Sequence, residues 1–201
     1  MTDVRAMRTA DLTGVVAIHL AAFPNFFLSF LGPSFLRVFY GFIAGEGVVL
    51  VALEDGQLAG FVAGVLEPRV FYRRLMRRRF AQLALAITPM VLRHPSTIAR
   101  VTRRWRQRTS AGNHEPAGAE LMSLAVESGH EHRGIGRALV AAFAMRVAAS
   151  GERRLWLTTD AADNDRVIHF YESQGFLRSL EFVTAEGRAM VELTRDVEPP
   201  S

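Results

Sequence analysis

The amino-acid sequence predicts a mixed α/β fold in which helices flank a central, mostly antiparallel sheet. Apolar runs of strand length alternate with longer runs whose apolar residues recur every three or four positions. The order is strand, two helices, a strand meander, then strand, helix, strand, helix and a hairpin, which favours one sheet with helices on its faces. A chain of 201 residues with 49% hydrophobic content can bury one substantial core. We therefore expect a single domain over residues 1–201.

The first half of the chain predicts a strand, two helices and an antiparallel pair of strands. Pro24 ends the first helical region, and Pro33 suits the first turn of the second helix. Asp55 and Gly56 form an Asp-Gly pair, which is a strong signal for a two-residue hairpin. The predicted elements are a strand at 3–7, helices at 9–20 and 33–43, and strands at 48–53 and 58–66.

Beyond residue 118 the pattern alternates between strands and helices. Gly151 and Gly175 each follow a helical run, as glycine commonly does just past a helix end. Ala185, Glu186 and Gly187 separate the last two strands as a hairpin turn. The predicted elements are strands at 121–126 and 155–159, helices at 134–149 and 164–174, hairpin strands at 177–184 and 188–194, and a flexible tail at 196–201.

Composition narrows the classes of function. The chain has no cysteine, which excludes a disulfide framework, thiol nucleophiles and thiolate metal sites, and no metal site is expected. There is no stretch of eighteen uninterrupted apolar residues, and the first residues lack the basic-then-apolar pattern of a secretory signal. We therefore expect a cytoplasmic protein.

Positive charge is concentrated in one segment. All 24 basic residues are arginines, and the window from Arg69 to Arg108 contains twelve of them and no acidic residue. Because the formal net charge is only +4, the rest of the chain is acidic. We interpret residues 67–118 as two basic amphipathic helices, broken near Pro89 or Pro95, whose apolar centre at 80–92 packs on the body of the protein.

The segment 121–139 runs from an apolar strand through a turn directly into a helix. Gly134 and Gly136 allow the backbone to approach a ligand without a Cβ, and a helix start presents unpaired amides and the positive end of its dipole. Arg133 and Arg137 could add charge-assisted contacts. This arrangement predicts a pyrophosphate site, although a turn that needs its glycines for packing alone remains the alternative.

The same segment resembles the acyl-CoA signature of the GNAT superfamily, a hydrophobic strand followed by R/Q-x-x-G-x-G/A at a helix start. In this sequence Glu131 stands in place of the usual Arg or Gln, and His132 in place of a frequent glycine. Because an acidic group near a pyrophosphate is unfavourable, Glu131 is expected to point away from it. Residues 164–176 are similar to the second GNAT motif, N-x-x-A-x-x-F-Y-x-x-x-G-F, at Asn164, Phe170, Tyr171, Gly175 and Phe176.

The resemblance implies a GNAT-like fold, acetyl-CoA as co-substrate and an amine as acceptor. Tyr171 would protonate the leaving thiolate, a role suited to a positioned hydroxyl, although a core aromatic is the alternative. Glu120 is the first candidate for the general base, with Ser123 positioning a water and His19, His114 and Glu115 as further candidates. The implied coenzyme contacts are Leu124, Ala125 and Val126 with pantetheine, Arg133, Gly134, Ile135, Gly136 and Arg137 with pyrophosphate, and Asn164 with the pantetheine arm.

Compared with a minimal GNAT fold, residues 67–118 form a basic helical insertion between the third and fourth strands. It is interpreted as a solvated cover, as a wall that attracts an anionic or amino-sugar acceptor, or as a surface on anionic lipid. No nucleic-acid recognition module is visible. Four phenylalanines in the loop 23–32 either line an acceptor pocket or anchor the loop.

Two functions remain open at this point. The first is an N-acetyltransferase acting on the primary amine of a small molecule. The second is a catalytically weak acyl-CoA-binding module that docks on anionic membranes or partners through its arginine-rich helices. A peripheral membrane contact and a homodimer are both compatible with the sequence.

Overall fold

The computed structural model describes residues 2–24, 26–93, 116–184 and 187–198. Its strands form one seven-stranded sheet in the order β1-β2-β3-β4-β5-β7-β6, and only β4 and β5 run parallel. The mixed, mostly antiparallel sheet predicted from the sequence is therefore confirmed. The strands are β1 (Asp3–Ala6), β2 (Val48–Glu54), β3 (Gln57–Val65), β4 (Ala119–Val126), β5 (Arg154–Asp160), β6 (Leu177–Val183) and β7 (Ala189–Asp196).

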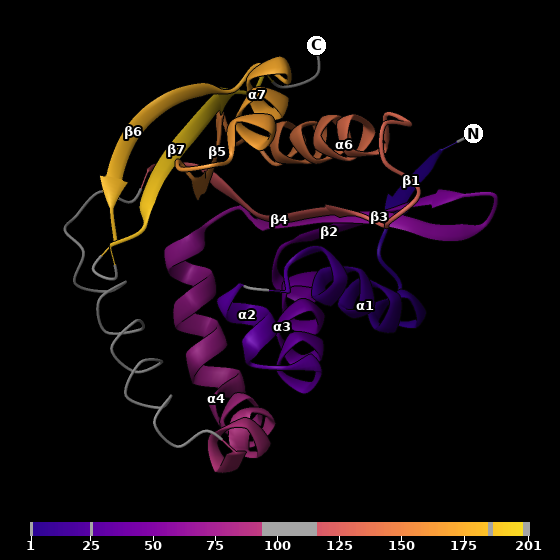
Figure 1. Cartoon of the computed structure of the whole chain (residues 1–201), viewed down its shortest axis with the longest axis vertical. Coiled ribbons are helices and arrows are strands. Elements are labelled where there is room, and N and C mark those ends of the chain that lie inside the picture. Colours follow the sequence, from indigo (N-terminus) through magenta and orange to yellow (C-terminus); the bar gives the residue numbers. More distant parts are fainter. Residues whose placement is uncertain (1, 25, 94–115, 185–186, 199–201) are drawn as a thin grey trace.

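Helices cover both faces of this sheet (Figure 1). A short 3-10 turn, η1 (Thr9–Asp11), precedes the first helix. On one side lie α1 (Leu12–Ala22), α2 (Phe27–Phe30), α3 (Pro33–Glu46) and α4 (Pro68–Arg93), and on the other lie α6 (Ile135–Ala149) and α7 (Asp165–Ser173).

The β2–β3 hairpin shows how a local signal becomes structure. Asp55 and Gly56 both have positive φ, at 52° and 79°. Positive φ at both central residues is the requirement of the type I′ turn that Asp-Gly pairs favour. The hairpin aligns β2 with β3, which then pairs antiparallel with β4.

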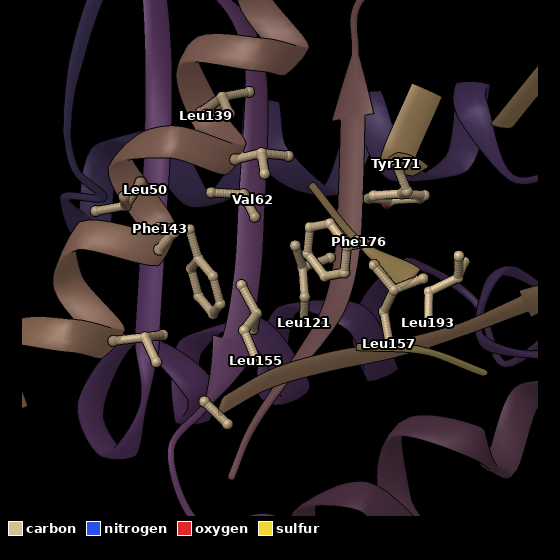
Figure 2. Close-up of a cluster of buried hydrophobic side chains, with 14 of the residues drawn as sticks. Leu50, Val62, Leu121, Leu139, Phe143, Leu155, Leu157, Tyr171, Phe176 and Leu193 are labelled. Atoms are coloured by element: carbon tan, nitrogen blue, oxygen red, sulfur yellow. The ribbon is translucent and has the colours of Figure 1, made fainter. Parts of the chain in front are cut away.

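Two hydrophobic clusters lie on opposite faces of the sheet. Figure 2 shows the cluster beneath α6, where Leu139 and Phe143 pack over Val62 and Leu121. The other cluster joins α1, α3 and the first turns of α4 to the sheet through Val16, Phe39, Tyr40, Phe61 and Phe71. Each strand in the middle of the sheet therefore buries both of its faces, which fixes its register.

The insertion differs from its prediction in two respects. Of the two proposed break points, Pro89 is excluded, because α4 continues as one helix to Arg93. The apolar centre is also not fully packed: Leu83 is buried, but Phe80, Leu85 and Leu92 are 61%, 74% and 77% exposed. Pro95 and the remainder of the predicted second helix, at 94–115, lie outside the described residues.

Candidate active site

The central feature of the site is the separation of two parallel strands. β4 pairs with β5 only at Ala119 with Leu155 and Glu120 with Trp156. Beyond that point, β4 pairs with β3 alone and β5 with β7 alone, among the residues that the structure describes. Beyond Glu120 and Trp156, β4 and β5 therefore do not pair with each other. Their facing backbone edges can bind an extended ligand.

The turn between β4 and α6 presents amides that have no hydrogen-bond partner within the described ranges of the chain. The first backbone bond of α6 runs from the Ala138 amide to the Gly134 carbonyl at 2.9 Å, so the amides of Ile135, Gly136 and Arg137 precede it. Gly134 is the N-cap and has no side chain to accept those amides, and the first turn holds no acidic residue. The helix start is therefore available to an anion.

The two glycines of this turn serve different purposes. Gly134 has a φ of +80°, in the left-handed region, and an added Cβ there would meet nothing within 4 Å. At Gly136, by contrast, an added Cβ would lie 3.3 Å from the ring of Phe170 on α7. Gly134 thus serves the turn's conformation, whereas Gly136 serves the packing of α6 on α7, which favours the packing alternative at that position.

The two departures from the family signature have a structural explanation. The Glu131 carboxylate accepts a hydrogen bond from the Gly129 amide at 2.7 Å. Hydrogen bonds from its own amide and from Gly129 lower the pKa of Glu131, so its negative charge is stabilised within the turn. His132 adopts a φ of +64°, the conformation that a glycine would supply without strain.

Two arginines lie beside the turn. Arg133 donates to the Glu54 carboxylate at 3.1 Å, so the β2–β3 hairpin holds its guanidinium. Arg166, in the first turn of α7, lies 3.0 Å from Nε2 of His132. Arg166 could not be predicted from the sequence, because its proximity to the turn depends on how α7 packs against α6.

Asn164 connects α7 to the end of β5. Its amide nitrogen donates to Oγ1 of Thr159 at 2.8 Å and to the carbonyl of Asp160 at 3.0 Å. These two bonds use both hydrogens of the amide group, so its oxygen is the atom left to accept from a ligand.

Tyr171 lies in the core cluster between α7 and the sheet and is 7% exposed. Its ring packs edge-on against Phe170 and Phe176, with centroids 5.1 Å and 5.5 Å away, and Figure 2 shows it beside Phe176. Burial raises the pKa of Tyr171 above its usual value, so the phenol is protonated at neutral pH. It can therefore act as a proton donor.

Glu120 is buried, with 6% exposure, at the last residue of β4 that pairs with β5. Nearby on the same strand, Ser123 is 7% exposed and accepts a hydrogen bond at 3.0 Å from the hydroxyl of Tyr40. The Tyr40 oxygen in turn lies 2.7 Å from Nδ1 of His19. We call His19, Tyr40 and Ser123 the buried polar row. Two further base candidates, His114 and Glu115, lie outside the described residues.

The loop between α1 and α2 contacts an ion pair at the end of β5. Arg188 binds the Asp160 carboxylate at the end of β5 with two nitrogens, at 2.6–3.1 Å, and its guanidinium lies 5.5 Å from the ring centroid of Phe26. Phe23 and Phe27 pack against the core, whereas Phe26 and Phe30 are 43% and 44% exposed. The loop therefore both anchors itself and leaves two aromatic side chains accessible.

Part of the arginine charge on α4 is neutralised from a neighbouring helix. Arg74 and Arg78 both bind the carboxylate of Glu46 on α3. A hollow of about 180 Å³ lies at this ion cluster, with Arg79 and Phe42 in its wall. It is lined by α3 and α4 alone and is separate from the gap between β4 and β5.

The described part of the chain lacks two classes of feature. No helix there is long and apolar enough to cross a membrane. No group of three or more His, Asp or Glu side chains there could hold a metal ion.

Comparison with known proteins identifies the family. Among solved structures, three similar ones are an alanine N-acetyltransferase of ribosomal protein S18 from Escherichia coli, a ribosomal-protein-alanine N-acetyltransferase from Brucella melitensis and an aminoglycoside 6′-acetyltransferase type Ii. Their identities to this chain are 16%, 18% and 16%, and their TM-scores are 0.60, 0.61 and 0.63. The alignments cover 100%, 97% and 99% of this chain and 97%, 99% and 99% of those chains.

At such identities the likeness shows the fold alone. No curated protein matches the sequence. The model of the acetyltransferase (GNAT) family, however, matches residues 15–176, which is most of the chain. Both sequence motifs lie within that match, and so do β4 and β5, the strands that separate. Strand β7, which pairs with β5, lies outside it. The chain therefore belongs to the acetyltransferase (GNAT) family, which uses acetyl-CoA as its co-substrate.

Proposed function

We propose that this protein transfers an acetyl group from acetyl-CoA to the primary amine of a small molecule. The observation that carries the proposal is the early end of the β4–β5 pairing at Glu120 and Trp156. The remainder of β4, to Val126, leads from there to the turn before α6. One ligand can then lie along the strand edge with its anionic end at the helix start. An acyl-CoA has that shape, with an extended arm and a pyrophosphate.

In this proposal the coenzyme contacts follow from available backbone groups. The edge of Leu124, Ala125 and Val126 pairs with the amides of the pantetheine arm. The amides at the start of α6 hold the pyrophosphate, assisted by the dipole of that helix. The oxygen of Asn164 accepts from a pantetheine amide, since its nitrogen is already bonded to β5.

The chemistry is a direct attack. The amine lone pair forms a bond to the thioester carbonyl carbon, and the carbon–sulfur bond then breaks. Tyr171 gives its phenolic proton to the departing thiolate, for which a buried and protonated hydroxyl is suited. The nitrogen loses a proton to Glu120, whose buried carboxylate sits where the strands separate. The products are an amide and free CoA.

The test is release of CoA with a panel of amines. The panel contains amino sugars, amino acids, polyamines, an aminoglycoside and a peptide with an N-terminal alanine, the last two because similar structures carry those activities in their names. Turnover with at least one amine that exceeds hydrolysis of acetyl-CoA by water is expected. If acetyl-CoA binds and no amine accelerates CoA release, the transferase assignment fails for these acceptors.

A second candidate function rests on α4. Its exposed surface carries Arg73 and Arg77, followed along the helix by Phe80, Leu85 and Leu92. Basic and apolar groups on one exposed helix are typical of a segment that lies on anionic lipid. In this alternative, the protein binds an acyl-CoA and docks on a membrane, and CoA release is weak with every amine.

A further inference from the structure

The buried polar row joins three elements that are distant in the sequence. His19 lies on α1, Tyr40 on α3 and Ser123 on β4, and they are 2%, 0% and 7% exposed. The two contacts within the row measure 2.7 Å and 3.0 Å. All three groups therefore lie on the side of the sheet opposite α6, directly beneath the strand that borders the gap.

The buried polar row makes the folded protein less stable than apolar side chains at these positions would. Burial lowers the pKa of His19 to about 4, so the imidazole is neutral at neutral pH. When Tyr40 donates to Ser123, its oxygen accepts from the Nδ1 hydrogen of His19, and the lone pair then lies on Nε2. Nε2 is buried without a hydrogen-bond partner in the described part of the chain. Such a group costs about 1–3 kcal/mol, and a native fold that retains one calls for an explanation.

A bulge in β4 turns Ser123 toward this row. Ala63 of β3 lies opposite Ser123 and Gly64 lies opposite Leu121, so Met122 is an extra residue in β4. Leu121 packs beneath α6, and regular alternation would direct residue 123 to the same face. The extra residue reverses the alternation and brings the Ser123 hydroxyl to Tyr40 instead.

The bulge and the row lie at the end of the β4–β5 pairing. Glu120 is the last paired residue of β4, and Ser123 is three residues further along the separated edge. Ser123 thus stands between Glu120, the proposed base, and Leu124, the first residue proposed to pair with pantetheine. A group bound at Ser123 would therefore lie one residue along β4 from the proposed pantetheine contact and three from the proposed base.

We propose that Ser123 holds the acceptor amine, and that Tyr40 and His19 are positioning residues that fix the Ser123 hydroxyl. This inference rests on the proposed function. A neutral primary amine must keep its lone pair free to attack the thioester, so a protein can hold it only through its N–H groups. The Ser123 oxygen has two lone pairs, of which Tyr40 uses one, and the second accepts an amine N–H.

The role predicts a change in amine binding without a change in coenzyme binding. Ser123→Ala removes the acceptor, and Tyr40→Phe removes the group that orients it while leaving its ring in the core. Each should raise KM for the most active amine of the panel about 3- to 10-fold, the range of one lost hydrogen bond. KM for acetyl-CoA and the rise in Tm with acetyl-CoA should stay as in the parent protein.

Three further variants separate a role in binding from a role in folding. Ser150→Ala removes a hydroxyl that bonds the Val147 carbonyl at the far end of α6 and should leave every constant unchanged. Ser123→Thr keeps the hydroxyl and should keep the parent KM for the amine. The double variant Ser123→Ala/Tyr40→Phe should have a KM for the amine no higher than that of the more impaired single variant, since both changes remove the same contact.

The outcomes are distinct. Three results would overturn the inference while leaving the proposed function intact. The first is an unchanged KM for the amine in both single variants, and the second is a KM in the threonine variant as high as in the alanine variant. The third is a KM in the double variant raised by the product of the two single effects. A parent protein that neither gains Tm with acetyl-CoA nor releases CoA with any amine would instead overturn the proposed function, and this inference with it.

Discussion

The guanidinium of Arg133 is bound to the carboxylate of Glu54, 3.1 Å away, so the residue expected to contact pyrophosphate already has an anionic partner. The pair joins the start of α6 to the end of β2, and His130 lies 3.6 Å from the same Glu54 oxygen. An incoming pyrophosphate would compete with Glu54 for Arg133, and the two anions would also repel each other.

Glu54→Gln should therefore strengthen acetyl-CoA binding. The gain should be about 2- to 5-fold in Kd, because Arg133 is more than half exposed and exposed ion pairs contribute at most about 1 kcal/mol. Calorimetric titration with acetyl-CoA measures it. Glu46→Gln, which removes the same charge beside Arg74 and Arg78, is the matched control and should leave Kd unchanged. Weaker binding in Glu54→Gln would mean that the pair orders the turn for its ligand.

The buried imidazole of His19 should make stability depend on pH. In the folded protein its pKa is about 4, whereas in the unfolded chain it is near 6.5. Between these values the unfolded chain binds a proton that the folded protein does not, so lowering the pH favours unfolding. Titration of His19 thus has little effect on stability above pH 6.5, and stability is lost progressively as the pH falls toward 4.

From pH 7 to pH 5 this loss should be about 2 kcal/mol. Urea unfolding of the parent and of His19→Gln at both pH values isolates it, because the other titrating groups are shared. The variant should be less stable at pH 7 and should lose less on acidification. Equal losses in the two proteins would show that His19 titrates normally in the folded state.

Gly134 and Gly151 offer a matched test of the phosphate turn. Both have positive φ, at +80° and +88°, and an added Cβ would meet nothing within 4 Å at either. Substitution by alanine should therefore cost each about 1 kcal/mol in backbone strain. Only Gly134→Ala should also weaken acetyl-CoA binding, because only Gly134 begins the helix with free amides. Equal Kd values for the two variants would remove the turn from the coenzyme site.

Local signals explain why much of the fold could be predicted. Asp55 and Gly56 encode their own turn, and Gly134, Gly151 and Gly175 each adopt the positive φ expected at a helix boundary. Strand and helix periodicities located every element beyond residue 118 to within a few residues. The short helix α2 was missed, because four residues are too few to show a period.

Features that depend on distant contacts could not be predicted. The polar row joins residues 19, 40 and 123, and the Arg188–Asp160 pair spans 28 residues, so neither leaves a periodic pattern. The position of β7 between β5 and β6 follows from antiparallel pairing on both of its edges. Pro89 was one of two positions proposed for a break in the insertion, but α4 continues through it to Arg93.

Tyr171 is the residue whose proposed role is simplest to test. Tyr171→Phe keeps the ring that packs on Phe170 and Phe176 and removes only the proposed proton donor. Turnover should fall about 10²-fold or more, while Kd for acetyl-CoA should change little. The measurement is CoA release under saturating acetyl-CoA. Unchanged turnover would make Tyr171 a core aromatic and leave the thiolate to be protonated by another group.

The exposed arginines of α4 decide between the two candidate functions. Arg74 and Arg78 are engaged by Glu46, and Arg79 binds Gln82, so Arg73 and Arg77 are the better residues to change. If α4 lies on lipid, Arg73→Glu/Arg77→Glu should release the protein from anionic vesicles at low salt. The control, Arg146→Glu/Arg153→Glu, changes the net charge equally at two exposed arginines outside α4.

Salt provides the second arm of this test. The Debye length falls from about 10 Å at 0.1 M to about 3 Å at 1 M, so binding carried by the α4 arginines should weaken steeply over that range. A variant that keeps its vesicle binding but raises KM for an anionic amine would make α4 a wall of the acceptor site. If the α4 variant and its control behave as the parent in both assays at every salt concentration, the arginines of α4 form a solvated cover over the ion cluster at Glu46.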